Sequence, residues 1–139
     1  RERFYLATES GKIPAPVLAE GIRKIATLKR LIETDNFSPG SVLYWDEPEV
    51  NLNPKLMDEV VDAILTLARA GVQVFLATHS YILLEEFRDR AEAGEVRYHG
   101  FDGDPESGVV VRHTDDLPKL RPNPILDHYE DLGLRKIRR

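Results

Sequence analysis

Two stretches of the chain carry apolar residues at three-to-four spacing, which predicts two amphipathic helices. The first begins at Glu20 and breaks at residues 36–40. The second starts with Asn53 as N-cap and Pro54 in the first turn, and it ends at Gly71. The apolar face of the second helix is formed by Met57, Val60, Val61, Ile64, Leu65 and Ala68.

Two continuous apolar runs, Val42–Trp45 and Val72–Ala77, flank the second helix. Unbroken apolar runs are typical of strands that are buried on both faces, as in parallel sheets. The order strand, helix, strand therefore predicts a βαβ unit with a right-handed crossover and a parallel strand pair.

The remaining segments predict smaller elements around this unit. Phe4–Ala7 has the composition of a short strand, and Glu9–Pro16 that of a turn. A helix is expected over Tyr81–Ala93, and Glu95–His99 with Gly108–His113 should form a terminal β-hairpin around the turn-rich segment Phe101–Ser107.

The length and composition favour one soluble globular domain over residues 1–139, with residues 117–139 as a charged, proline-containing tail. The net charge of −5 gives no global basic footprint for nucleic acid, although a local patch such as Arg135–Arg139 leaves that possibility open.

No apolar run reaches membrane-spanning length, and the absence of cysteine fits a reducing cytoplasm. Since the sequence begins at Arg1 rather than Met, we expect it to be a piece of a longer protein. His99, His113 and His128 lack metal-ligand spacing and are expected on the surface.

Polar residues with useful chemistry follow both buried runs. Asp46 and Glu47 come directly after the first run, and Thr78-His79-Ser80 follows the second. Because ligands bind at the carboxyl ends of strands in open α/β sheets, these side chains should share one edge. There Asp46 can hold Mg²⁺ and Glu47 can activate a water. Pro48 should hold Glu47 in extended backbone geometry, and His79 can sense a phosphate oxygen.

These two motifs resemble the heads of ABC, SMC and RecF-like ATPases, and in particular prokaryotic AAA-family ATPases related to the overcoming-lysogenization-defect proteins. The resemblance rests on Asp46–Pro54 followed by Ala77–Ser80, and it covers roughly Leu18–Phe87. Those relatives often carry His where this chain has Asn53. The implied fold is α/β, the C-terminal part of an ABC-type P-loop NTPase domain, with parallel strands, flanking helices and a terminal hairpin.

The resemblance also implies roles for single residues. Asp46 would bind magnesium, Glu47 would be the catalytic base and His79 the switch histidine, while Asn51–Pro54 would be the D-loop. The implied cofactors are ATP and Mg²⁺. Nucleotide contacts would come from Asp46, Thr78, Asn51, Asn53 and Gly21.

A weaker resemblance lies just before the first helix, where ABC proteins carry a signature motif that meets the partner's nucleotide. Leu18–Lys24 occupies this place. Gly21 would let the backbone approach phosphate at a helix N-terminus. The serine of the signature is replaced by Ala19, and the negative charge of Glu20 would be compensated by Arg23 and Lys24.

The chain carries no phosphate-binding loop of the Gly-x₄-Gly-Lys-Ser/Thr type. Gly11-Lys12 does not qualify, because Leu6 stands at the place of the first glycine and Ile13 follows the lysine. The sequence therefore predicts an ATPase head that needs an N-terminal P-loop segment and an ATP-sandwiched homodimer, and that is inactive as an isolated chain.

Two other functions remain compatible with the sequence. The chain could be a non-catalytic dimerisation or docking module. It could also be a metal-dependent nuclease that uses Asp46, Glu47 and Glu49, although no catalytic lysine accompanies these carboxylates.

Overall fold

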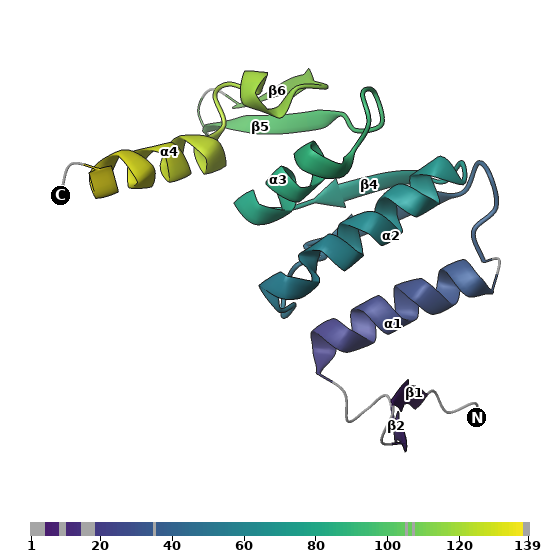
Figure 1. The fold of residues 1–139 in the computed structure, drawn as a ribbon. Helices are drawn as coiled ribbons and strands as arrows, with labels where there is room; N and C mark the ends of the chain where they lie inside the picture. Colours follow the sequence, from purple (N-terminus) through teal and green to yellow (C-terminus); the bar gives the residue numbers. More distant parts are fainter. Residues whose placement is uncertain are drawn as a thin grey trace. The chain divides into compact units, whose positions relative to one another are not determined.

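The computed structural model describes residues 5–8, 11–14, 19–34, 36–104, 106 and 108–137. The chain divides into two units, Arg1–Thr78 and His79–Arg139. The elements of the first unit, in chain order (Figure 1), are β1 (Tyr5–Thr8), β2 (Gly11–Pro14), α1 (Glu20–Glu33), β3 (Val42–Asp46), a 3-10 turn (Pro54–Leu56), α2 (Met57–Arg69) and β4 (Gln73–Ala77). Those of the second unit are α3 (Tyr81–Arg90), β5 (Tyr98–Asp104), β6 (Gly108–Thr114), a 3-10 turn (Leu117–Lys119) and α4 (Pro124–Ile137).

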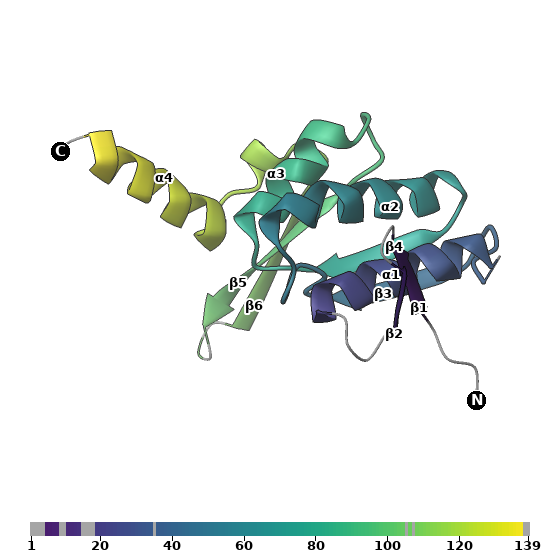
Figure 2. The same ribbon diagram turned by 60° about the horizontal axis from the view of Figure 1, so that its bottom comes forward.

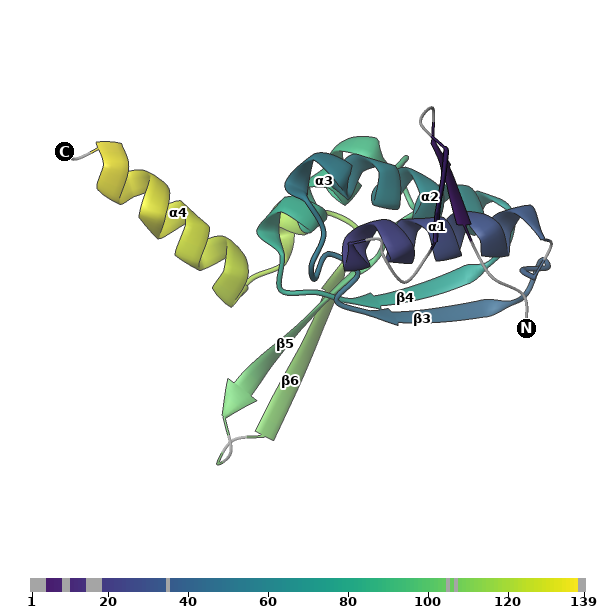
Figure 3. The same ribbon diagram turned by 90° about the horizontal axis from the view of Figure 1, so that it is seen from below.

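The expected βαβ unit is present in the first unit. Strands β3 and β4 pair in parallel, from Val42 opposite Gln73 to Asp46 opposite Ala77. Helix α2 connects them, and it lies with α1 over the same face of the strand pair (Figures 2 and 3). The core of this unit consists mainly of the apolar face of α2, including Met57, Val60, Val61, Ile64, Leu65 and Leu67.

The other face of the strand pair is exposed, which corrects the expectation that both faces are buried. Exposed and half-buried residues alternate along both strands. Tyr44 is 75% exposed and stacks on Phe75, which is 44% exposed, with ring centroids 5.1 Å apart. The described residues thus cover one face of this apolar strand pair and leave the other face exposed.

The N-terminal segment forms a hairpin, where the sequence suggested a strand followed by a turn. Tyr5–Thr8 pairs antiparallel with Gly11–Pro14. The backbone of Gly11 has φ +130°, a conformation in which glycine has no steric penalty. Phe4 lies outside the described residues.

The second unit contains more regular structure than the sequence indicated. Helix α3 begins as expected, because the Ser80 hydroxyl accepts a hydrogen bond from the Leu83 amide at 3.2 Å. The hairpin strands extend through Phe101–Asp104, which was expected to be turn. The segment expected as a charged tail contains a 3-10 turn and helix α4. Its buried residues are Leu117, Leu120, Asn123 and Leu126.

His99 and His113 lie directly opposite each other in this hairpin, with ring centroids 6.0 Å apart. Both are exposed, as is His128. Among the described residues, no helix has the length and apolar character needed to cross a bilayer.

Candidate functional site

The candidate site lies where β3 and β4 end side by side. Asp46 is opposite Ala77 in the parallel register, and the Glu47 amide donates a hydrogen bond to the Ala77 carbonyl at 2.8 Å. Thr78 follows directly. The structure therefore brings Asp46, Glu47 and Thr78 to one sheet edge, because parallel strands deliver their carboxyl ends together.

The backbone of Glu47 differs from the expected extended geometry. Its φ is +45°, in the left-handed region, although Pro48 follows. Two hydrogen bonds oppose the preference imposed by proline: the bond of the Glu47 amide to β4, and a turn in which the Glu47 carbonyl accepts from the Val50 amide at 3.1 Å. Such a conformation costs on the order of 1–3 kcal/mol. Full burial of Pro48 helps to hold this turn in place.

Glu49, whose role the sequence left open, bonds to the end of the neighbouring strand. Its Oε1 accepts a hydrogen bond from the Thr78 hydroxyl at 2.5 Å. Its Oε2 is buried and has no hydrogen-bond partner among the described residues. The Thr78 hydroxyl thus holds the Glu49 carboxylate at the end of β4.

The loop after Pro48 is held by the first turns of α1. Asn51 has φ +62°, which asparagine tolerates better than most residues. Its side-chain amide donates to Glu20 Oε2 at 2.7 Å. The Lys24 ammonium donates to the Val50 carbonyl at 2.9 Å. These contacts join residues that are 31 and 26 positions apart in the sequence.

Gly21 is buried where α1 meets this loop. A Cβ at this position would lie 2.5 Å from the Asn51 carbonyl oxygen and 3.0 Å from the Leu52 Cα. The missing side chain is therefore needed for contact with the chain's own loop. Ala19, the N-cap of α1, makes no side-chain capping bond. Leu18, which begins the signature-like stretch, lies outside the described residues.

Two further residues proposed from the sequence have clear local positions. Asn53 accepts a hydrogen bond from the Lys55 amide at 3.0 Å, so its side chain caps the 3-10 turn that precedes α2. His79 is exposed and begins the second unit, directly after Thr78.

The carboxylates at this edge fit a magnesium ion that is shared with a substrate. Mg²⁺ is usually held by one or two carboxylates together with waters and phosphate oxygens. Asp46 is exposed at the strand end, and Glu47 follows it. Within the described ranges, no three His, Cys, Asp or Glu side chains are grouped closely enough to hold a metal by themselves. The donor set thus suits an ion that arrives with a phosphate.

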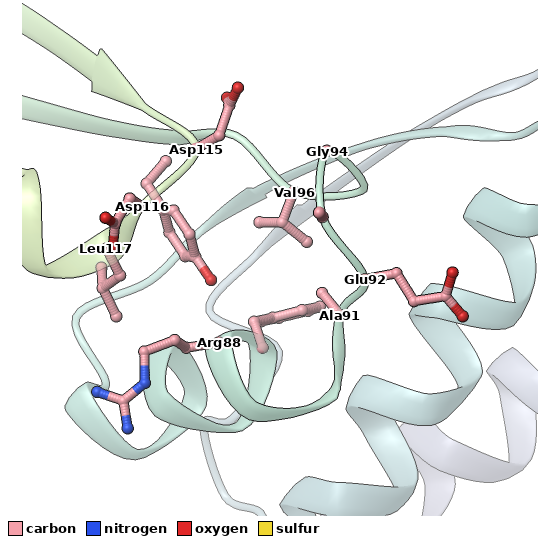
Figure 4. A pocket seen from close by; sticks show the side chains of 11 residues that line it. Arg88, Ala91, Glu92, Gly94, Val96, Asp115, Asp116 and Leu117 are labelled. Carbon is pink, nitrogen blue, oxygen red and sulfur yellow. The ribbon is translucent and has the colours of Figure 1, made fainter.

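A separate pocket of about 200 Å³ lies in the second unit, between the end of α3 and the hairpin (Figure 4). Two of the carboxylates that line it are engaged elsewhere: Asp115 pairs with Arg97 at 2.9 Å, and Asp116 pairs with Lys119 at 2.9 Å. Tyr98 lines the pocket and is only 8% exposed, and burial raises the pKa of its phenol. No residue of the candidate site lines this pocket.

Sequence reasoning missed three contacts that shape the site. Glu20 with Asn51, Lys24 with Val50 and Glu49 with Thr78 each join distant parts of the chain, so no local spacing reveals them. The one available signal was Gly21, a glycine in the first turn of a helix, which indicates a close backbone approach.

Two curated relatives of the chain are glutamate transport ATP-binding proteins. The glutamate transport ATP-binding protein GluA of Corynebacterium efficiens is 25% identical over 114 residues, which is 82% of this chain and 45% of that protein. GluA of Corynebacterium glutamicum is 26% identical over 89 residues, covering 64% of this chain and 35% of the relative. The Old nuclease of Escherichia phage P2 is 30% identical over 63 residues, 45% of this chain and 11% of that protein. The chain thus spans less than half the length of these curated relatives.

A solved structure supports the fold. It is described as "Structural biochemistry of ATP-driven dimerization and DNA stimulated activation of SMC ATPases" and superposes with a TM-score of 0.60 at 14% identity. The match covers 95% of this chain and 69% of the SMC ATPase chain. At this identity the likeness shows the fold alone, which is that of a P-loop NTPase.

The family assignment comes from a protein-family model that matches residues 2–85, more than half of the chain. Its description is "AAA domain, putative AbiEii toxin, Type IV TA system". The matched segment contains both strand ends of the candidate site. The chain therefore belongs to this family of AAA domains and represents the C-terminal part of a P-loop ATPase fold of the ABC and SMC kind.

Proposed function

We propose that this chain is the Walker B, D-loop and switch-histidine part of a head that binds and hydrolyses ATP. The observation that carries the proposal is the parallel register of β3 and β4, which places Asp46 and Glu47 beside the end of β4 at one sheet edge. Membership in an ATPase family and the SMC-like fold support the same function.

Each residue at this edge has a role in the proposed reaction. Asp46 would hold magnesium, and the ion would supply positive charge that neutralises the phosphate oxygens. Glu47 accepts the proton of the attacking water. His79 donates a hydrogen bond to the terminal phosphate. The left-handed backbone of Glu47 helps to fix the direction of its carboxylate.

The proposed head needs a phosphate-binding segment that this sequence does not contain. The exposed face of the strand pair supports that need, since parallel sheets are normally covered on both faces. Tyr44 and Phe75 are the apolar side chains such a segment would cover. We therefore expect the isolated chain neither to bind ATP at micromolar concentration nor to turn it over. Calorimetry that showed micromolar affinity for the isolated chain would contradict this.

We further propose that hydrolysis requires two heads that close on ATP. Gly21 and the first turn of α1, together with Asn51 and Asn53 of the D-loop, would meet the nucleotide of the opposite head. The Glu47→Gln variant of the intact protein should bind ATP without hydrolysing it and accumulate as a dimer. Sedimentation with ATP and magnesium measures this, and Glu59→Gln on the exposed side of α2 is the control. A Glu47→Gln variant that stays monomeric with ATP would contradict the sandwich dimer.

The exposed aromatic pair also favours a second candidate, a docking module without catalysis. On this alternative, Tyr44→Ser would abolish association with the partner of the chain. Glu47→Gln would then leave every activity of the intact protein unchanged, whereas the ATPase proposal requires a large loss.

A further inference from the structure

The loop Glu49–Leu52 is fastened to α1 of its own chain by three separate features. The Asn51 side-chain amide donates to Glu20 Oε2 at 2.7 Å. The Lys24 ammonium donates to the Val50 carbonyl at 2.9 Å. Between these bonds, Gly21 allows the Asn51 carbonyl to approach so closely that a Cβ would be 2.5 Å from it.

The two polar contacts stabilise a loop conformation that is unfavourable by itself. Asn51 has φ +62°, and Glu47, two residues before the loop, has φ +45°. The loop's own backbone bonds are two turn contacts, from Val50 to Glu47 at 3.1 Å and from Leu52 to Glu49 at 3.0 Å. The contacts from α1 add to the bond between Glu49 and Thr78 in selecting this arrangement over extended alternatives.

We propose that Glu20 and Lys24 are positioning residues that clamp the loop Glu49–Leu52, and with it the start of the D-loop Asn51–Pro54, onto the first turns of α1. The loop and the helix start would then meet a nucleotide as one rigid element. This inference rests on the proposed function for its catalytic consequence, whereas the clamp itself is independent of it. Glu20 and Lys24 act through Asn51 and Val50 and do not contact the nucleotide.

The clamp accounts for the charge of Glu20, which would otherwise disfavour an anion at the start of α1. Its Oε2 accepts from Asn51, so this oxygen is directed to the loop. Lys24, which could have served as a phosphate ligand, is half-buried and directs its ammonium to a backbone carbonyl. The backbone amides of the first turn of α1 then remain the groups able to meet a phosphate, since they have no intrahelical acceptor.

Hydrogen–deuterium exchange on the intact protein without nucleotide tests the clamp directly. In the Glu20→Ala/Lys24→Met double variant, the amides of residues 50–53 should exchange about ten-fold faster, because local opening becomes easier. Lys29→Met/Glu33→Gln is the matched control. This exposed pair lies at the other end of α1, and its charged atoms are 4.0 Å apart, so its loss should not affect residues 50–53. The single variant Glu20→Gln keeps an acceptor oxygen for Asn51, so residues 50–53 should exchange as slowly in it as in the unmodified protein.

Steady-state phosphate release by the same variants tests the catalytic consequence. The double variant should have a kcat several-fold lower and an unchanged KM for ATP. The single variant Glu20→Gln should keep the kcat of the unmodified protein. Unchanged exchange at residues 50–53 would overturn the clamp. A raised KM with unchanged exchange would overturn it too, because Lys24 would then be a nucleotide ligand. Failure of the proposed function is distinguishable, since an intact protein without ATP turnover would still show the exchange difference.

Discussion

Gly21 gives the most specific prediction about how the candidate site is built. Replacing Gly21 with Ala places a methyl group 2.5 Å from the Asn51 carbonyl oxygen and 3.0 Å from both Cα and Cδ1 of Leu52. Two of these three atoms belong to the backbone, so rotation of a side chain cannot relieve the contact. The loop has to move away from α1, and the bonds to Glu20 and Lys24 lengthen with it.

The magnitude follows from opposing contributions. Overpacking against a fixed backbone costs about 1–3 kcal/mol. Weakening of two exposed hydrogen bonds adds up to about 1 kcal/mol. Better helix propensity of alanine returns about 0.5–1 kcal/mol. The net expectation for Gly21→Ala is a loss of about 2 kcal/mol in the free energy of unfolding of the first unit.

Urea unfolding followed by tryptophan fluorescence measures this loss, because the chain has one tryptophan, Trp45, and it lies in β3. With an m value of about 1 kcal/mol/M for a unit of this size, the midpoint should fall by about 2 M. Gly133→Ala is the control, since Gly133 lies in α4 and a Cβ there meets open space. It should stabilise its helix by about 0.5–1 kcal/mol, measured by circular dichroism. A Gly21→Ala midpoint equal to or above that of the unmodified chain would refute the close approach.

Three further predictions concern other parts of the chain. A double-mutant cycle between Glu49→Ala and Thr78→Val, read by Trp45 fluorescence, should give a coupling of about 1.5–3 kcal/mol for this charge-assisted bond, and a coupling near zero would contradict it. Burial raises the pKa of Tyr98, so its contribution to the stability of the second unit is present below about pH 10 and lost as the pH rises through the folded-state pKa. Calorimetry from pH 9 to about pH 11 should therefore show that Tyr98→Phe loses less free energy of unfolding than the unmodified chain, and equal losses would contradict the raised pKa of Tyr98. The exposed stack of Tyr44 on Phe75 should cause the isolated chain to associate in sedimentation experiments, and Tyr44→Lys should reduce this association; equal association of the two would contradict the prediction.

The βαβ unit was predictable because its signals are local. Apolar spacing located α2, the run Val42–Trp45 located β3, and Asn53 with Pro54 marked the start of the helical segment. Parallel pairing then requires the ends of β3 and β4 to meet, so the residue pattern alone was enough to place Asp46 and Thr78 at one edge.

Features that depend on contacts between distant residues were not predictable. The left-handed backbone of Glu47 results from a bond to β4 and a turn, which together override the preference set by Pro48. An apolar run also does not reveal which face of a strand the chain itself covers, as the exposure of Tyr44 shows. The C-terminal segment was expected to be a tail because charged residues and prolines dominate its sequence pattern. Its isolated apolar residues Leu117 and Leu120 are nevertheless buried.

The role of Glu47 as catalytic base is the central claim, and phosphate release by the intact protein tests it most directly. The assay compares the unmodified protein with Glu47→Gln and with the control Glu59→Gln, in magnesium and ATP. Removal of a general base should lower the rate by about 100-fold or more, and the control should retain full activity. Equal rates for Glu47→Gln and the unmodified protein would contradict the account and would leave the docking module as the better explanation of this chain.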